Sequence, residues 1–285
     1  MPYRTRIHIA VAVFAAIFII GTLHPARAEE KAPIRALLIL GGCCHDYATQ
    51  KDLLKTGIED RANIQVEVVY SPDKSTAPPL EIYGNAKYAD GFDVVIHDEC
   101  AADIKDTAVV ECVLAPHRAG IPAVNLHCAM HSYRTAPDVK VPVDPGTGES
   151  LWFDYLGVQS SGHGPQKPIA VVYSDKSHPV TMGLTDWTTI KEELYNNVVV
   201  RDGTHVLARG SQEPNDKPNY TEAAIVWTSE YGDKKARVFS TTLAHNNETV
   251  ADERYLDLVT RGVLWACGKL DNAGKPAGGY GPPAR

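Results

Sequence analysis

Three short apolar runs constrain the fold of this chain more than any other feature of its sequence. They are residues 34–40, 92–97 and 121–127, and the first reads IRALLIL before Gly41-Gly42. Continuous apolar runs of this length are typical of strands buried on both faces, as in parallel sheets covered by helices. Helical patterns at 47–61 and 102–118 lie between them, with a further strand predicted at 64–70. This alternation predicts βαβ units and a mostly parallel central sheet.

Polar side chains follow the predicted strands at the points where the strands end. In sheets of this kind, ligands bind in the crevice beyond the carboxyl ends of the strands. Candidate functional residues are therefore expected there: His45, Asp46, Asp98, Glu99, His127, Cys128 and His131.

The turn after residue 126 resembles the strand-to-helix turn where class I amidotransferase-like folds place a nucleophilic cysteine. Counted from Pro122, the nucleophile position falls on His127, and Cys128 comes one residue later. The glycines expected around the oxyanion hole of such a turn are missing. A hydrolase that uses the Cys128 thiol is therefore an alternative that the sequence does not favour.

The N-terminus has the pattern of a secretory signal peptide. Arg4 and Arg6 precede an apolar run over 9–23, and Ala26-Arg27-Ala28 forms a small-residue cleavage site. We expect residues 1–28 to be removed, leaving a periplasmic or secreted chain with no stable membrane insertion. Removal of three arginines changes the formal charge from −7 to 25 − 35 = −10. An acidic chain of this kind is not expected to bind nucleic acid.

Residues 29–270 are expected to form one domain. Beyond Asp144-Pro145, short strands alternate with turn clusters, which predicts a mixed or antiparallel extension of the same sheet. A last helix is predicted at about 252–267. The Gly- and Pro-rich tail over 271–285 is expected to be disordered.

The cysteines do not form a recognisable framework. Six are present at irregular spacings, without a C-x-x-C motif. Disulfides are permitted in an exported protein but are not required in a domain of this size. The disulfide pairing therefore stays open.

Taken in order, several segments resemble the ThuA-like proteins of the trehalose-utilisation type. The matching segments are LLILGGCCHDY, VNLHCAMHSYR, Gly162-His163, SHPVTMGL, KEELY, AIVWTSEYG, ARVFSTTLAH and RGVLWACG. The resemblance implies an α/β fold of the flavodoxin-like, class I glutamine amidotransferase-like type, a three-layer sandwich around a mostly parallel sheet. In KEELY, Glu192 stands where the family more often has aspartate.

The resemblance also implies the residues of the site. Those expected to be catalytic are His45, Asp46, His127, His163, Glu193 and His245. Apart from the resemblance, Asp98, Glu99 and His131 are expected to bind substrate because they stand at strand ends. Tyr133 and Tyr195 are expected to bind it because their flat rings can stack on a sugar. His127, His163 and His245 would be the ligands of a divalent metal such as zinc, although the cofactor itself stays unknown.

The function that these residues favour is that of an exported enzyme of carbohydrate metabolism. It would act on a sugar or keto-sugar by histidine and carboxylate chemistry, with or without a metal. Whether it is a hydrolase, a lyase or an isomerase stays open. The main alternative is a non-catalytic carbohydrate-binding or partner protein, and the third is the Cys-dependent hydrolase. The expected partner is a small carbohydrate, and association into a homo-oligomer is left open.

Overall fold

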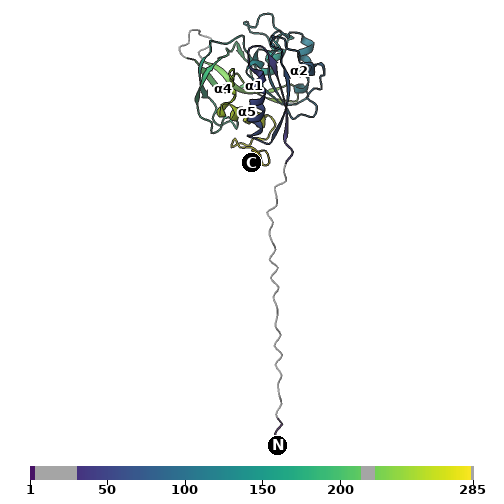
Figure 1. The fold of residues 1–285 in the computed structure, drawn as a ribbon, viewed down its shortest axis with the longest axis vertical. Helices are drawn as coiled ribbons and strands as arrows, with labels where there is room; N and C mark the ends of the chain where they lie inside the picture. Colours follow the sequence, from purple (N-terminus) through teal and green to yellow (C-terminus); the bar gives the residue numbers. More distant parts are fainter. Residues whose placement is uncertain (4–30, 213–221, 284–285) are drawn as a thin grey trace.

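The computed structural model describes residues 1–3, 31–212 and 222–283, and its centre is a nine-stranded sheet (Figure 1). The strands, in their order across the sheet, are β2 (Ile64–Ser71), β1 (Ile34–Gly42), β3 (Val94–Cys100), β4 (Ala123–Leu126), β11 (Ala236–Thr241), β10 (Ala223–Tyr231), β9 (His205–Ser211), β6 (Lys167–Tyr173) and β7 (Trp187–Glu192). Two short strands, β5 (Val158–Gln159) and β8 (Val199–Val200), pair separately.

The first half of the sheet is parallel and the second half is antiparallel. Strands β2, β1, β3, β4 and β11 pair in parallel. The pairs β11–β10, β10–β9, β9–β6 and β6–β7 are antiparallel. Seven of these nine strands therefore point the same way, with β10 and β6 reversed. The predicted mostly parallel sheet with an antiparallel extension is confirmed.

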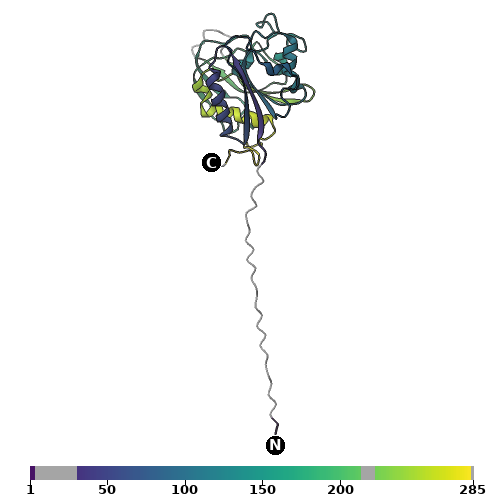
Figure 2. The same ribbon diagram turned by 45° about the vertical axis from the view of Figure 1, so that its right-hand side comes forward.

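Helices cover both faces of the sheet. They are α1 (Tyr47–Glu59), α2 (Thr107–Arg118), α3 (Leu151–Leu156), α4 (Asn247–Val250) and α5 (Glu253–Ala266), together with the 3-10 turns η1 (Glu81–Gly84) and η2 (His127–His131). Figures 1 and 2 show α1 and α5 on one side of the sheet and α2 on the other. The architecture is therefore a three-layer α/β sandwich.

Alternation along β1 explains why its apolar run is continuous. Leu38 and Leu40 pack in one buried cluster with residues of α1 and α5. Leu37 and Ile39 pack in a second cluster with residues of α2 and α3. Because side chains alternate along a strand, both parities must be apolar when both faces are covered.

Aspartates begin the three longest helices. The side chains of Asp46, Asp106 and Asp252 accept hydrogen bonds from backbone N–H groups in the first turns of α1, α2 and α5. Such caps satisfy N–H groups that lack a partner within the helix. The helices predicted at 47–61, 102–118 and 252–267 are confirmed, and they start or end up to five residues inside those limits.

The C-terminal segment differs from the sequence-based expectation. Residues 271–283 lie against the domain, although their composition predicts disorder. Asn63 donates backbone and side-chain hydrogen bonds to the carbonyls of Tyr280 and Gly279, and the Lys31 and Lys269 ammonium groups lie over the Tyr280 ring. These contacts supply the partners that composition alone does not show. The structure describes residues 271–283 of this segment and not its last two.

The predicted signal peptide lies almost wholly outside the described residues, since positions 4–30 are not described. Within the described ranges, no helix combines the length and the apolar character needed to cross a membrane.

Candidate functional site

Segments far apart in the sequence bring histidines and one glutamate to the carboxyl edge of the sheet. His45 follows β1, His127 follows β4, His245 follows β11 and Glu193 follows β7. These four strands point the same way, so their carboxyl ends share an edge. His163, which precedes β6, joins them from the other side of Glu193. Five of the six residues predicted to be catalytic therefore lie together.

The Glu193 carboxylate is the centre of this cluster. Its Oε2 atom lies 3.6 Å from Nε2 of His127, 3.6 Å from Nε2 of His163 and 3.4 Å from Nδ1 of His245. Burial raises the pKa of Glu193, but the neighbouring imidazoles more than offset this and hold it well below its usual value. The site therefore presents an ionised carboxylate, 6% exposed, surrounded by three imidazoles.

Hydrogen bonds to the backbone fix the orientation of two of these rings. Nδ1 of His127 donates to the carbonyl of Thr242 over 2.7 Å, and Nδ1 of His163 donates to that of Gly164 over 2.9 Å. The Nε2 atom of each ring is thereby directed at Glu193. In His127 this atom also lies 3.3 Å from the hydroxyl of Tyr195. A backbone carbonyl on one nitrogen commonly sets the tautomer of a catalytic or metal-binding histidine.

His45 and His245 complete the buried side of the cluster. The His45 ring packs edge-on against His127 and His245, with centroid distances of 4.8 and 4.7 Å. Burial, together with the neighbouring His127 and His245, lowers the pKa of His45 to about 2. Burial also lowers the pKa of His245, but Glu193 outweighs it and the net shift is upward. The cluster therefore shifts the pKa values of these two neighbouring rings in opposite directions.

Unfavourable backbone conformations coincide with the cluster. Among the described residues, five other than glycine have positive φ angles, and three of these are Cys44 at 79°, His127 at 37° and Ala244 at 86°. Cys44 and Ala244 directly precede His45 and His245. Such conformations cost about 1–3 kcal/mol each and gather at functional sites. The turn at His127 also matches the nucleophile position that the sequence predicts for it.

Several supporting residues were missed by sequence reasoning. Glu192 is fully buried and accepts hydrogen bonds from the backbone N–H groups of His245, over 2.8 Å, and Asn246, over 3.2 Å. The Gln166 amide lies 2.9 Å from Nε2 of His245 and 3.3 Å from Glu193. The sequence offered a reason to select Glu192, because it stands in the KEELY segment, whereas Gln166 belongs to no recognisable motif.

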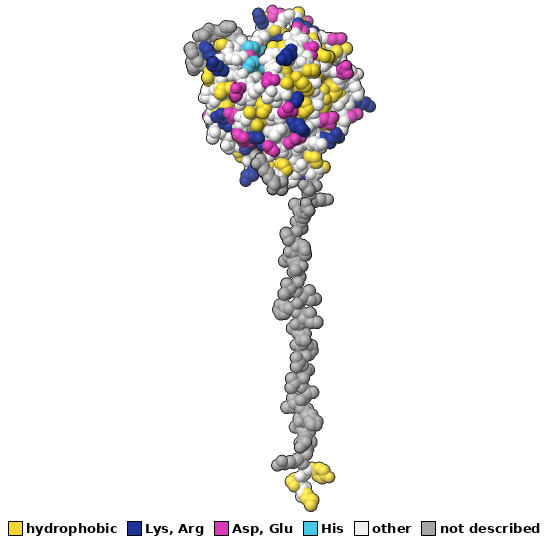
Figure 3. Space-filling view, viewed as in Figure 1, with side chains coloured by type: hydrophobic (Ala, Val, Ile, Leu, Met, Phe, Trp, Pro, Cys, Tyr) yellow, Lys and Arg dark blue, Asp and Glu magenta, His cyan; other side chains and the backbone are white. Residues whose placement is uncertain are grey.

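Stacked rings form one wall of the site. His131 stacks on Tyr195 with a centroid distance of 4.1 Å, and His163 lies beyond it at 5.6 Å from Tyr195. His131 and Tyr195 are buried, whereas the His163 side chain is 40% exposed. Histidine side chains also form a small patch on the face shown in Figure 3. Of the residues predicted to bind substrate, His131 and Tyr195 border the cluster. His163, which was predicted to be catalytic, is the member of the cluster most open to solvent.

The other three residues predicted to bind substrate are core residues. Glu99 is fully buried, and its Oε1 atom receives hydrogen bonds from Tyr83, Tyr133 and His97. This removes Glu99 and Tyr133 from the histidine cluster. Asp98 points to the opposite face, near Tyr47 and Tyr255, where burial raises its pKa well above its usual value. The structure does not bring these three residues into the histidine cluster, because β3 is buried on both faces.

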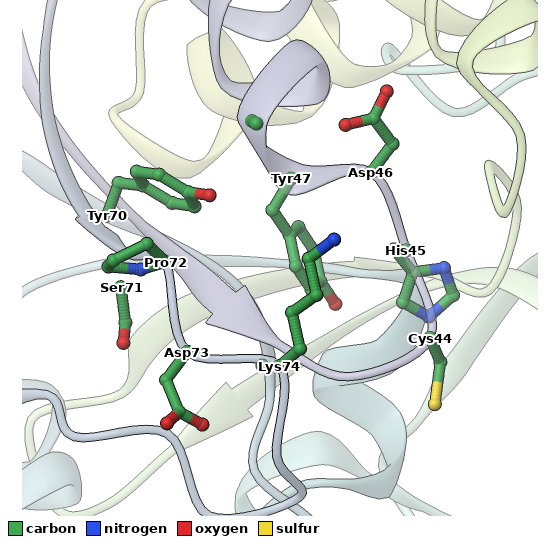
Figure 4. A pocket seen from close by; sticks show the side chains of 11 residues that line it. Cys44, His45, Asp46, Tyr47, Tyr70, Ser71, Pro72, Asp73 and Lys74 are labelled. Atoms are coloured by element: carbon green, nitrogen blue, oxygen red, sulfur yellow. The ribbon is translucent and has the colours of Figure 1, made fainter.

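Asp46 lies beside the cluster but acts as a helix cap. It caps α1 and accepts a hydrogen bond of 2.8 Å from the side-chain amide of Asn247. A cavity of about 380 Å³ adjoins it, between the ends of β1 and β2. Figure 4 shows Cys44, His45 and Asp46 on one side of this cavity, with Tyr70 and Asp73 across from them. Its volume lies near the lower end for small-molecule sites.

The structure also contains groups that could hold a metal ion. Ligand atoms of His45, His127 and His245 lie within 4.8 Å of one another. Nδ1 of His45 is buried and has no hydrogen-bond partner among the described residues, and Nδ1 of His245 faces the Glu193 carboxylate at 3.4 Å. Unpartnered imidazole nitrogens fit a cation. This set differs from the predicted one, because His163 lies across Glu193 and His45 takes its place.

The cysteine predicted beside the nucleophile position is paired. Disulfides join Cys100 to Cys128 and Cys43 to Cys44. Cys112 and Cys267 are free. A disulfide-bonded Cys128 has no thiol to act as a nucleophile.

Comparison with known proteins agrees with this fold and with the resemblance noted in the sequence. Two solved structures of putative ThuA-like proteins share the fold. The one from Parabacteroides merdae has 23% identity and a TM-score of 0.59, and the alignment covers 84% of this chain and 91% of that one. The one from Bacteroides uniformis has 17% identity and a TM-score of 0.60, covering 87% and 97%. No curated protein matches the chain.

The model of the ThuA family, described as trehalose utilisation, matches residues 35–266. This range contains all of the sheet except Ile34, the first residue of β1, and every histidine of the cluster. The predicted α/β sandwich around a mostly parallel central sheet is confirmed as well. The chain belongs to the ThuA family.

Proposed function

We propose that this protein is an enzyme that transfers protons on a carbohydrate, either a sugar or an oxidised keto-sugar. The observation that carries the proposal is the ring of three imidazoles within 3.6 Å of the Glu193 carboxylate. It lies at the carboxyl edge of the sheet, where open α/β folds bind ligands.

Two features of the ring support proton transfer. Nδ1 of His127 donates its proton to the carbonyl of Thr242, which leaves Nε2, beside the Tyr195 hydroxyl, as the nitrogen that can accept a proton from substrate. The ionised Glu193 stabilises the positive charge that would then develop on the imidazole. In a keto-sugar, the hydrogen on the carbon next to the carbonyl is the most acidic C–H, and its removal needs a base of this kind.

The carbohydrate part of the proposal rests on two observations. The family that the chain belongs to is described as one of trehalose utilisation. The cavity beside His45 is lined by Asp46, Asp73 and Lys74, whose side chains can hydrogen-bond to sugar hydroxyls. Its size suits a small molecule. A periplasmic or secreted location, which the N-terminal pattern supports, is part of the same proposal.

A divalent metal fits the same residues. His45, His127 and His245 would hold it, since their ligand atoms lie within 4.8 Å of one another and Nδ1 of His45 is buried without a partner among the described residues. A bound metal would polarise a carbonyl or hydroxyl oxygen of the substrate. Glu193 and His163 would then remain as the groups that hold or move protons.

The test is turnover on a panel of sugars and keto-sugars, assayed with and without added Zn²⁺. Glu193→Gln keeps the shape of the side chain but removes its charge. It should lower kcat/KM by about 10²-fold or more, in the range of a lost acid–base group. The matched control is Glu230→Gln, an exposed residue of β10, which should leave kcat/KM unchanged.

The outcomes separate the two main alternatives. Saturable sugar binding without turnover by the wild-type protein would overturn the enzyme proposal in favour of a carbohydrate-binding protein. Turnover that survives Glu193→Gln would place the chemistry elsewhere in the molecule.

A further inference from the structure

Four cysteines gather at the carboxyl ends of three neighbouring strands. Cys43 and Cys44 follow β1, Cys100 ends β3, and Cys128 lies in η2 directly after β4. These strands are adjacent in the order β1, β3, β4. Besides the two disulfides, Sγ of Cys43 lies 3.5 Å from Sγ of Cys100. All four sulfurs therefore form one contiguous group.

The glycines before Cys43 make this grouping possible. Gly42 has a φ angle of 104°, and a Cβ atom there would collide with the carbonyl of Cys100. Because glycine has no side chain, the end of β1 can lie directly against the end of β3. The Gly41-Gly42 pair thus brings Cys43 to Cys100.

Structural stabilisation does not explain the Cys43–Cys44 pair. A disulfide stabilises a fold mainly by closing a loop in the unfolded chain, and its effect grows with the loop length. Cys43 and Cys44 are neighbours, so their bond closes no loop. The Cys100–Cys128 bond, with a separation of 28 residues, has such an effect. The Cys43–Cys44 pair calls for a chemical role.

The sulfurs and one imidazole form two overlapping sets of ligand atoms. Cys43, Cys44 and Cys100 offer atoms within 4.8 Å of one another, and so do His45, Cys100 and Cys128. Cys100 and Cys128 are each only 4% exposed, whereas Cys44 is open to solvent. Soft thiolate ligands select Cu(I) and Zn²⁺ among the common metal ions.

We propose that these four cysteines and His45 form a redox-gated binding site for a soft metal cation of the Cu(I) type. With the disulfides formed, the sulfurs are not available as thiolates and the site is closed. With the disulfides reduced, the same positions present thiolates beside the His45 ring. The proposal goes beyond the carbohydrate chemistry and does not depend on it.

Opening of the site follows ordinary thiol–disulfide exchange with a dithiol as reductant. One thiolate of the dithiol attacks Sγ of Cys44, and Cys43 leaves as a thiolate. The second thiol of the reductant then releases Cys44 and leaves as a cyclic disulfide. Each disulfide takes up two electrons and two protons in this way.

The 3.5 Å contact between Sγ of Cys43 and Sγ of Cys100 allows the buried Cys100–Cys128 disulfide to be reduced next. The Cys43 thiolate attacks Cys100, which forms a Cys43–Cys100 bond and releases Cys128. A second dithiol reduces that bond. Binding of the cation then displaces one proton from each thiol that coordinates it.

The experiment compares the oxidised and reduced forms of the whole protein. Reduced protein, freed of dithiol under argon, is titrated with Cu(I) against a competing Cu(I) chelator, and the sulfur-to-copper absorption in the near ultraviolet is recorded. We expect the reduced protein to bind Cu(I) at least 100-fold more tightly than the oxidised protein. Equal affinity in the two forms would overturn the proposal.

Variants identify the sulfurs that bind the cation. Cys43→Ser and Cys100→Ser should each weaken Cu(I) binding at least tenfold. The control Cys112→Ser/Cys267→Ser removes the two free cysteines and should bind as the wild type does. If the cluster variants do not fold, alkylation of the reduced wild type with and without Cu(I) gives the same information. Protection of Cys112 or Cys267 rather than the cluster would contradict the proposal.

The readout is metal affinity and not turnover, so this inference and the proposed function can fail independently. Loss of Cu(I) binding would leave the imidazole ring around Glu193 untouched. Absence of sugar turnover would likewise leave the cysteine site untouched.

Discussion

At the scale of single residues, His127 shows how much of the site a sequence can predict. Its place in the strand-to-helix turn follows from counting along the chain, and the structure gives it a φ angle of 37° and an Nε2 atom directed at Glu193. The convergence of His163 and His245 on the same glutamate, with His45 packed against His127 and His245, follows from the strand-end rule together with the family resemblance.

Sequence reasoning fails where a strand is buried on both faces. The end of β3 is at the right edge of the sheet, but its alternating side chains point into two cores. Glu99 therefore contacts Tyr83 and Tyr133, and Asp98 lies near Tyr47. Successive side chains of a strand point to opposite faces of the sheet, but this alternation does not show which face holds a ligand. That information comes only from the packed helices.

Cys128→Ala tests the thiol hydrolase directly. We expect turnover to persist, because His127 holds the nucleophile position and Cys128 is disulfide-bonded to Cys100. Loss of this disulfide should lower the free energy of unfolding by about 3 kcal/mol. Kinetics and urea denaturation measure the two effects separately. Complete loss of activity in a folded variant would instead support the hydrolase.

His117 makes the stability of the fold depend on pH. Nδ1 of His117 donates to the carbonyl of Ile121 over 2.8 Å, and its Nε2 lies 3.0 Å from Nε2 of His97. Burial, followed by the neighbouring His97, lowers the pKa of His117 to about 3. In the unfolded chain a histidine titrates near pH 6.5. The contribution of neutral His117 to the free energy of unfolding should therefore be fully present above about pH 6.5 and be lost as the pH falls toward 3.

His117→Gln should make this pH dependence shallower. Between pH 6 and pH 4 the unfolded state binds one more proton at His117 than the folded state does. As the pH falls through this window, the free energy of unfolding of the wild type should fall by about 1.4 kcal/mol per pH unit more than that of the variant. Urea denaturation at several pH values gives both slopes. Parallel slopes would show that His117 takes up its proton in the folded protein.

At the scale of elements, a single glutamate links β7 to the loop that follows β11. The two oxygens of Glu192 hold the backbone N–H groups of His245 and Asn246, which fixes the loop that carries His245. Glutamate is longer than the aspartate that the family more often has at this position. This length lets the Glu192 carboxylate reach the backbone of the loop. Element positions were predictable from periodicity, but this link between two elements was not, because no local pattern records a partner 53 residues away.

Glu192→Gln should therefore disturb both the fold and the activity. Its amide nitrogen would face a backbone N–H, so one donor loses its acceptor inside the protein. We expect a loss of about 1–3 kcal/mol in stability, the cost of an unsatisfied buried group. We also expect an approximately tenfold fall in kcat/KM with an unchanged pH profile. A change in the profile itself would indicate that Glu192 takes part in proton transfer, and Glu230→Gln again serves as the exposed control.

At the scale of the whole molecule, this is an acidic ThuA-family chain with its polar site at one edge of the sheet, and we propose that it is exported. Export predicts that the mature chain begins at Glu29 or within a residue or two of it, because cleavage follows the Ala26-Arg27-Ala28 site. N-terminal sequencing of the exported protein checks this. Recovery of intact Met1 from a washed membrane fraction would support a retained anchor.

The central claim is that the imidazole ring around Glu193 moves protons on a sugar. The most direct measurement is proton NMR of the keto-sugars in D₂O, which follows exchange of the hydrogen on the carbon next to the carbonyl. We expect the wild-type protein to incorporate deuterium at that carbon. His127→Ala should remain folded and should slow deuterium incorporation by about 10²-fold or more. Deuterium incorporation at the wild-type rate by His127→Ala, or none by the wild-type protein on any keto-sugar of the panel, would contradict the central claim.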